Sequence, residues 1–267
     1  MRCSIFEPRI FRCKYTQNIW YYGCFHLKNF TLSFFLPNFD GGCAFSCLEI
    51  SWRRWFTANC FNTLTICVMA DSVITLSSLR RLLQANRSIR RFDQSVALSP
   101  ELLAGLVDLA RYTASGRNVQ MLRYRLVYSP QECSRVFPLL GWAGYLRDWP
   151  GPDPCERPAA YIVQCMDTRL GTGCLCDDGL QLEAITLGAA TQGIGCCIIK
   201  SFDKQAVSAE LSLADYLEPH YVVALGYPDE KVVIEDMQPG LDADFKYYRT
   251  PDGVHHVPKR PLSDILL

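Results

Sequence analysis

The composition of the sequence changes abruptly near residue 69, and this change limits how much of the chain can form an ordinary globular domain. Residues 1–68 contain seven of the fourteen cysteines and half of the aromatic residues, but only three acidic residues. Residues 69–267 contain 20 Lys and Arg against 24 Asp and Glu, so this part is slightly acidic whereas the first part is basic. We therefore expect two parts, 1–68 and 69–267, and the second is long enough to bury a core by itself.

Residues 1–68 sustain neither the helical nor the alternating hydrophobic period, which predicts an irregular N-terminal extension. Basic residues interrupt every apolar run, so the segment resembles neither a signal peptide nor a membrane span. A disulfide or zinc module is the alternative that its cysteines suggest, but their number is odd and they contain no Cys-x2-Cys pair. A further hypothesis is that Met69 is the natural start and that residues 1–68 are translated upstream sequence.

From Ser77 onward, helical and strand patterns alternate. Ser77, Ser99 and Asp203 are candidate N-caps, and Asp177 and Asp178 suit the positive end of a helix dipole. Residues 230–240 are polar and predict a loop. The expected helices are 77–85, 100–113, 179–192 and 203–211, and the expected strands are 123–128, 159–166, 193–199 and 219–227.

The segment from Asn86 to Phe92 concentrates Arg87, Arg90 and Arg91 around Ser88. Guanidinium groups bind phosphate oxygens through two parallel hydrogen bonds, and a serine hydroxyl adds a compact donor. The cluster therefore predicts a phosphate site. The alternative is a solvated basic turn beside a helix.

A second segment, 114–120, places two amide side chains, Asn118 and Gln120, just after Ser115 and Gly116. Small residues let backbone N–H groups approach a ligand closely, and amides offer paired donors and acceptors to a planar heterocycle. Together the two segments predict a site for a phosphorylated ring compound.

These two segments and the C-terminal run from Tyr247 to Leu262, in this order, resemble the FMN-dependent nitroreductase family, and the resemblance extends from about Leu76 to the C-terminus. Alternating helices and strands alone would suggest a doubly wound parallel sheet. The resemblance instead implies an α+β nitroreductase-like fold, in which helices flank a central β-sheet and two chains form an intertwined homodimer with FMN at the interface.

The resemblance also implies roles for individual residues. Arg87, Ser88 and either Lys259 or Arg260 would hold the FMN phosphate, and Arg90 would lie beside the flavin pyrimidine. Ser115, Asn118 and Gln120 would face the ribityl chain and the ring, in part from the partner subunit. The backbone at Lys200 and Ser201 would lie near flavin N5. The chain departs from the family pattern at Asn86, at Met121-Leu122 and at Lys200-Ser201.

Three aromatic residues in a proline-rich stretch, Trp142, Tyr145 and Trp149, are candidate substrate contacts by the same resemblance. The alternative is that they cap the core as part of a rigid loop.

The implied activity is that of an FMN oxidoreductase. NAD(P)H would pass hydride to flavin N5, and a nitro compound, a quinone or a similar electron-poor small molecule would then be reduced in a ping-pong cycle. The flavin performs this redox chemistry, so no catalytic side chain is expected. The alternative is a non-catalytic flavin-binding or flavin-carrier protein. The motifs specify neither the physiological acceptor nor a preference for NADH over NADPH.

Other classes of function are disfavoured. Nucleic-acid binding would require a basic domain, whereas residues 69–267 are acidic. No metal site is expected: Cys174 and Cys176 are one residue apart and fit small hydrophobic residues near a helix start, and the adjacent His255 and His256 would point to opposite faces of a strand. The absence of an address signal and the unpaired cysteines suggest the cytoplasm, with no membrane partner.

Overall fold

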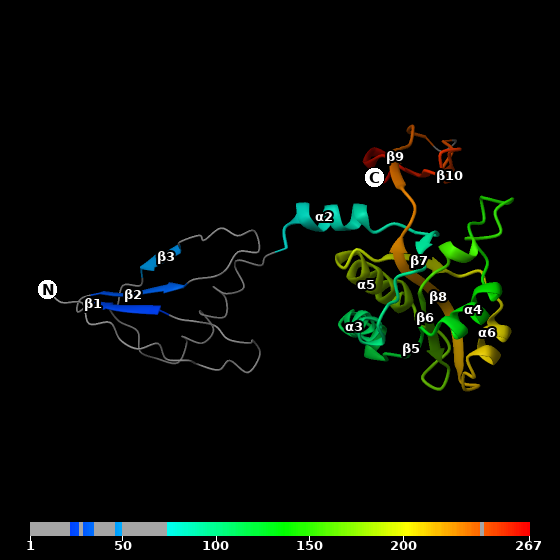
Figure 1. The fold of residues 1–267 in the computed structure, drawn as a ribbon, viewed down its shortest axis with the longest axis horizontal. Coiled ribbons are helices and arrows are strands. Elements are labelled where there is room, and N and C mark those ends of the chain that lie inside the picture. The colour runs from blue at the N-terminus through cyan, green and yellow to red at the C-terminus, as the bar shows by residue number, and fades with distance from the viewer. Residues whose placement is uncertain (1–21, 27–28, 35–45, 50–73, 241–242) are drawn as a thin grey trace. The chain divides into compact units, whose positions relative to one another are not determined.

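The computed structural model describes residues 22–26, 29–34, 46–49, 74–240 and 243–267. The chain divides into two compact units, Met1–Val73 and Ile74–Leu267, which are described separately (Figure 1).

In the first unit, three strands form one antiparallel sheet. They are β1 (Tyr22–His26), β2 (Asn29–Phe34) and β3 (Ser46–Glu49), in the order β1-β2-β3. Strands therefore occur where the sequence pattern predicted irregular chain. The hypothesis about Met69 lies outside the described residues and stays a prediction.

A five-stranded sheet forms the centre of the second unit. Its strands are β4 (Phe92–Asp93), β5 (Leu122–Val127), β6 (Ala160–Asp167), β7 (Gly195–Ile199) and β8 (Leu217–Pro228). The order is β4-β8-β6-β5, and β7 also pairs with β8. All these strand pairings are antiparallel, which confirms the α+β expectation over a doubly wound parallel sheet. All eight residues of β6 are buried, as expected of a central strand.

Helices cover both faces of this sheet (Figure 1). On one face, α3 (Pro100–Ala110) and α5 (Asp177–Thr191) pack Leu103, Leu106 and Ile185 against Ile162 and Val223. On the other face, α4 (Pro130–Val136) and α6 (Lys204–Glu210) contribute to a second core cluster that includes Val136, Val207, Tyr161, Val163 and Val222. Alternate residues of β6 and β8 thus supply the two cores, because successive side chains of a strand point to opposite faces.

Polar caps fix where the helices begin. Ser99 and Asp203 cap α3 and α6 as predicted, each accepting a hydrogen bond from a backbone N–H of the first turn. The predicted cap Ser77 is wrong, because α2 (Leu76–Ala85) begins earlier and Thr75 accepts from the backbone N–H of Ser78 at 3.1 Å. Ser77 lies inside the first turn. The described part of the second unit also contains four short 3-10 helices: Gly116–Asn118, Phe137–Leu139, Pro154–Glu156 and Leu262–Asp264.

A small second sheet lies in the C-terminal region. It comprises β9 (Val232–Asp236), β10 (Tyr248–Arg249) and β11 (His255–Lys259), in the order β10-β11-β9, with β11 parallel to β9. The prediction of a loop over 230–240 is therefore wrong for Val232–Asp236. Val232, Val233 and Ile234 are β-branched and pair with β11, so a distant partner strand outweighs the polar surroundings. Among the described residues, no helix has the length and apolar character needed to cross a bilayer.

Candidate functional site

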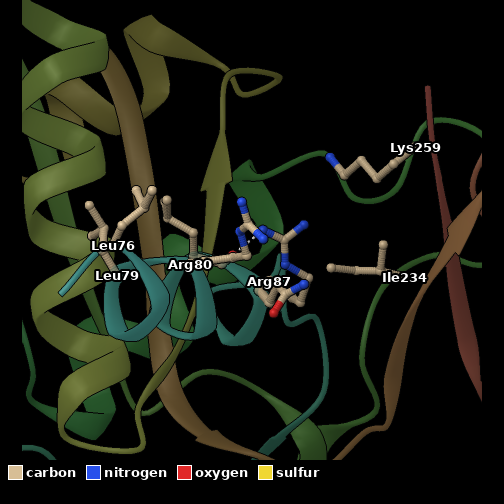
Figure 2. A pocket seen from close by; sticks show the side chains of 8 residues that line it. Leu76, Leu79, Arg80, Arg87, Ile234 and Lys259 are labelled. Carbon is tan, nitrogen blue, oxygen red and sulfur yellow. Dashed lines mark hydrogen bonds between the residues drawn. The ribbon is translucent and has the colours of Figure 1, made fainter. Parts of the chain in front are cut away.

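Arg87 and Lys259 are far apart in the sequence, near the first and last residues of the second unit. In the structure they line the same cavity of about 370 Å³ (Figure 2). Arg80 of α2 is a third cation in its lining. In Figure 2 the guanidinium groups of Arg80 and Arg87 lie near each other, and the Lys259 side chain points toward them. The remaining lining is largely apolar and is formed by Leu76, Leu79, Leu83, Gln84 and Ile234. Arg80 was not among the residues that the motifs identified.

The end of α2 holds Arg87 in place. Its Nη2 donates to the carbonyl of Leu83 at 2.7 Å, which is a favourable position for a cation because the helix dipole is negative there. Partial burial lowers the pKa of Arg87, although the negative charge of Glu183 raises it. Its buried Nε has no hydrogen-bond partner among the described residues. Arg87 therefore combines a structural role at the helix end with an unused donor for an anion.

Residues on either side of Arg87 attach the segment to the core. Asn86 Nδ2 donates to Thr186 Oγ1 of α5 at 2.9 Å. Ser88 forms a parallel bridge with Cys196 of β7, and the backbone N–H of Ile89 donates to the carbonyl of Cys196 at 2.9 Å. The arginine-rich segment is thus an irregular extension of the sheet edge.

Arg90 lies apart from the lining of this cavity. It is buried, its Nη1 is 3.2 Å from His255 Nε2, and its guanidinium carbon lies 4.8 Å from the centre of the Tyr247 ring. The buried carboxylate of Glu230 accepts from the backbone N–H groups of Arg90 and Arg91, and from Arg249 Nη2 at 3.0 Å. One carboxylate therefore links the arginine-rich segment to the C-terminal sheet.

The predicted ring-binding segment is anchored to the start of α5. Ser115 Oγ donates to Asp177 Oδ2 at 2.6 Å, and the backbone N–H of Gly116 donates to Asp177 Oδ1 at 2.9 Å. Ser115 Oγ also accepts from the backbone N–H of Gln120 at 3.0 Å. Asp177 is buried, and only its place at a helix start marked it in the sequence.

The same segment has an unusual backbone. Arg117, Asn118 and Gln120 all have positive φ angles, between 52° and 56°. Non-glycine residues rarely adopt this region, and such residues cluster at ligand sites where the surrounding structure enforces them. Arg117 and Asn118 belong to the 3-10 helix that Asp177 holds.

Helix α5 connects the two segments. Arg87 interacts electrostatically with Glu183, and Ser115 contacts Asp177. These two carboxylates are six residues apart on one helix, which corresponds to about 9 Å along its axis at 1.5 Å per residue.

The other predicted site residues lie elsewhere. Lys200 follows β7 and lies about 13 Å along the strand, at 3.3 Å per residue, from Cys196, the residue that bonds the arginine-rich segment. Its Nζ is 5.4 Å from the centre of the Tyr221 ring. The carbonyl of Ser201 accepts from the backbone N–H of Gly141 at 2.7 Å. Of the two C-terminal cations, Lys259 lines the cavity, whereas Arg260 Nη1 donates to the carbonyl of Gly240 at 3.1 Å.

The three candidate aromatic contacts separate into two groups. Trp142 packs against the core and lies 5.7 Å from Phe137 between ring centres, as the capping alternative predicts. Tyr145 and Trp149 instead line a second cavity of about 460 Å³. Arg249 lies 4.5 Å above the Trp149 ring, and Arg91 and Arg147 also contribute to this lining.

Comparison with known proteins gives structural but not sequence matches. No protein-family model and no curated protein matches the sequence. Among solved structures, the chain is similar to a nitroreductase family protein from Clostridium novyi NT, with 21% identity over 56% of this chain and 84% of that chain and a TM-score of 0.48. It is also similar to an FMN-dependent nitroreductase from Clostridium difficile R20291 (18% identity, 56% and 87% covered, TM-score 0.48). A nitroreductase-like protein from Streptococcus mutans gives 16% identity, 58% and 91% covered, and a TM-score of 0.49.

Proposed function

We propose that residues 69–267 form an FMN-binding oxidoreductase domain of the nitroreductase type, which uses NAD(P)H to reduce a nitro compound, a quinone or a similar electron-poor molecule. The observation that carries this proposal is the meeting of Arg87 and Lys259 at one cavity, together with Arg80. The two predicted phosphate ligands come from segments far apart in the sequence, so their meeting is a property of the fold.

The donors at this cavity suit a phosphate monoester. Three cations line the cavity, one more than the two negative charges of the phosphate, and the Nε of Arg87 has no hydrogen-bond partner among the described residues. A hydrogen bond between charged partners contributes roughly 1.5–3 kcal/mol, so removal of one such cation should weaken phosphate binding by a measurable factor. The residues present therefore fit the FMN phosphate.

Ser115, Asn118 and Gln120 would bind the rest of the cofactor near the start of α5. FMN, when bound, supplies the hydride acceptor and donor of the reaction. The protein's own tasks are then to orient the cofactor and to admit the nicotinamide and the acceptor in turn, and we assign no side chain as acid, base or nucleophile.

An FMN titration of the full-length protein tests the phosphate site. We expect Lys259→Ala to weaken FMN binding at least tenfold, measured by quenching of flavin fluorescence, because it removes a charge-assisted contact. Lys246→Ala is the matched control, since Lys246 is exposed and does not line the cavity, and its affinity should equal that of the wild type. Equal affinities for all three proteins would refute the assignment of this cavity to the phosphate.

A second measurement separates the oxidoreductase from a flavin carrier. The FMN-loaded protein is mixed anaerobically with NADH or NADPH, and the flavin absorbance is followed. Bleaching with either nicotinamide supports the oxidoreductase. Tight FMN binding without bleaching by either nicotinamide would favour the carrier.

A further inference from the structure

Three potential metal ligands meet beside the start of α5, although the sequence spacing predicted no metal site. They are Cys174 in the loop before α5, Asp178 in the first turn of α5, and His220 in β8. One ligand atom from each lies within 4.8 Å of the others. Cys174 is buried, and the other two are half-buried. The neighbouring Cys176 is exposed and is not part of the group, and the imidazole comes from a strand that is distant in the sequence.

The distance between the sulfur and nitrogen ligand atoms suits a single small ion. Cys174 Sγ and His220 Nδ1 are 3.9 Å apart. Two ligands of a tetrahedral zinc ion, with bond lengths of about 2.3 Å to sulfur and about 2.0–2.1 Å to nitrogen, lie roughly 3.6 Å apart. A shift of a few tenths of an ångström would therefore bring both atoms into the coordination sphere.

The surroundings also resemble those of a metal centre. A histidine that binds zinc through one nitrogen commonly directs its other ring N–H to a carboxylate. Here His220 Nε2 lies 4.0 Å from Glu218 Oε1, and Glu218 is itself held by Lys204 Nζ at 2.9 Å. Cys174 also belongs to a buried apolar cluster with Met121, Leu122 and Met166.

We propose that Cys174, Asp178 and His220 bind one Zn²⁺ through Sγ, a carboxylate oxygen and Nδ1. Combined sulfur, nitrogen and oxygen donors suit zinc, whereas magnesium and calcium prefer oxygen alone. The thiol releases its proton when the ion binds. Three protein ligands leave a fourth position for water or an external ligand, as in zinc sites that are not closed.

Such an ion would stabilise the segment that carries Ser115 and Gln120. Asp178 is adjacent to Asp177, whose carboxylate holds Ser115 and Gly116. An ion that ties Asp178 to β8 and to the preceding loop would fix the start of α5, and through Asp177 the 3-10 helix. This inference does not depend on FMN binding.

Cobalt substitution tests the site in the full-length, reduced and metal-free protein. Co²⁺ bound by a thiolate gives a sulfur-to-cobalt charge-transfer band. Other cysteines of the chain can also bind Co²⁺ and add to this band. The site is therefore assessed from the difference in bound metal and in band intensity between the wild type and each variant. We expect Cys174→Ala and His220→Gln each to lose one equivalent of bound metal and the corresponding part of the band. Cys176→Ala, two residues away and exposed, should behave as the wild type.

Equal stoichiometry and equal spectra for Cys174→Ala, His220→Gln and Cys176→Ala would overturn the proposal. Asp178→Asn provides a milder variant if either of the first two does not fold. It should retain the band but bind Co²⁺ at least tenfold more weakly, because a neutral amide replaces a charged ligand. Unchanged affinity in that variant would likewise count against the site. Competition with Zn²⁺ in the wild type should abolish the band, and persistence of the band would exclude zinc as the preferred ion.

Discussion

His255 is fully buried between charged groups of three segments, and its position makes the stability of the fold depend on pH. Burial lowers its pKa to about 4, and the positive charges of Arg90, Arg249 and His256 act in the same direction. The imidazole is therefore neutral in the folded protein at pH 7. With Nε2 unprotonated, it accepts the hydrogen bond from Arg90 Nη1 at 3.2 Å.

The free energy of unfolding should fall as the pH decreases from about 6.5 to about 4. An unfolded histidine has a pKa of about 6.5, so in this range the unfolded chain binds more protons than the folded one, and the loss amounts to about 3 kcal/mol. His255→Gln retains an acceptor for Arg90 but does not titrate. The free energy of unfolding, measured with urea between pH 4.5 and pH 7.5, should therefore change less with pH for this variant than for the wild type.

The comparison of slopes contains its own control. Carboxylates whose pKa is lowered by basic or hydroxyl partners, such as Asp167 beside Arg169, lose their stabilising effect below their unfolded pKa in both proteins. Their contribution is the same in both proteins and cancels when the pH dependence of His255→Gln is subtracted from that of the wild type. Identical slopes for wild type and His255→Gln would show that His255 does not titrate with unfolding.

At the scale of single residues, the sequence motifs identified residues that line the cavity, but not the residues that hold them in place. Arg87 and Lys259 were found because their motifs are local. Glu230 and Asp177 were not assigned their roles, although each orders a segment of the candidate site. Nothing in the neighbourhood of Glu230 indicates that Arg90 and Arg249 will meet there, since such contacts depend on how distant segments pack.

At the scale of elements, the arginine-rich segment depends on its contact with β7. The backbone of Ile89 is bonded to Cys196, and the Ile89 side chain lies directly over Gly195. A Cβ at position 195 would lie 2.6 Å from Ile89 Cγ1 and 2.8 Å from Ile89 Cβ. These atoms cannot move away without loss of the backbone hydrogen bond, so glycine is required here for reasons of space.

Gly195→Ala should destabilise the protein by about 1–3 kcal/mol, the usual effect of overpacking, and should weaken FMN binding because Arg87 is displaced. Gly105→Ala is the matched control. Gly105 lies in α3 with open space around its Cα, so alanine should stabilise by about 0.5–1 kcal/mol and leave FMN affinity unchanged. Urea unfolding and the FMN titration measure both effects. Equal stability of the two variants would contradict the close packing of Ile89 on β7.

The elements of the central layer could be predicted because their signals are local. Ser99-Pro100 and Asp203 are N-cap signals, and the apolar run of β6 is a signal of burial. The antiparallel pairing of the sheet was not predicted, because no local signal encodes it and the family resemblance implied only the α+β class with a central sheet flanked by helices. Strand β9 was missed because its pairing with β11 joins residues more than twenty positions apart.

At the scale of the whole molecule, the exposed apolar side chains of the second unit favour association of two chains. Helix α2 has no buried residue, and Leu76 is 75% exposed. At the C-terminus, Leu262, Ile265 and Leu266 are each more than 60% exposed. Apolar clusters at both ends of a domain are typical of surfaces that a partner covers, and the family resemblance implies that this partner is a second copy of the chain.

We therefore expect the full-length protein to be a homodimer, with twice the chain mass of 30.3 kDa in light scattering. Ile265→Glu should raise the dissociation constant at least tenfold, because burial of a charge in an apolar contact is unfavourable. Tyr128→Glu is the control, since Tyr128 is also partly exposed but follows β5, away from α2 and the C-terminus in the sequence. If Ile265→Glu and Tyr128→Glu dissociate at the same concentration as the wild type, the C-terminal residues do not form the interface. A wild-type protein that is monomeric at every concentration would refute the dimer itself, and the ring-binding segment would then have to act within one chain.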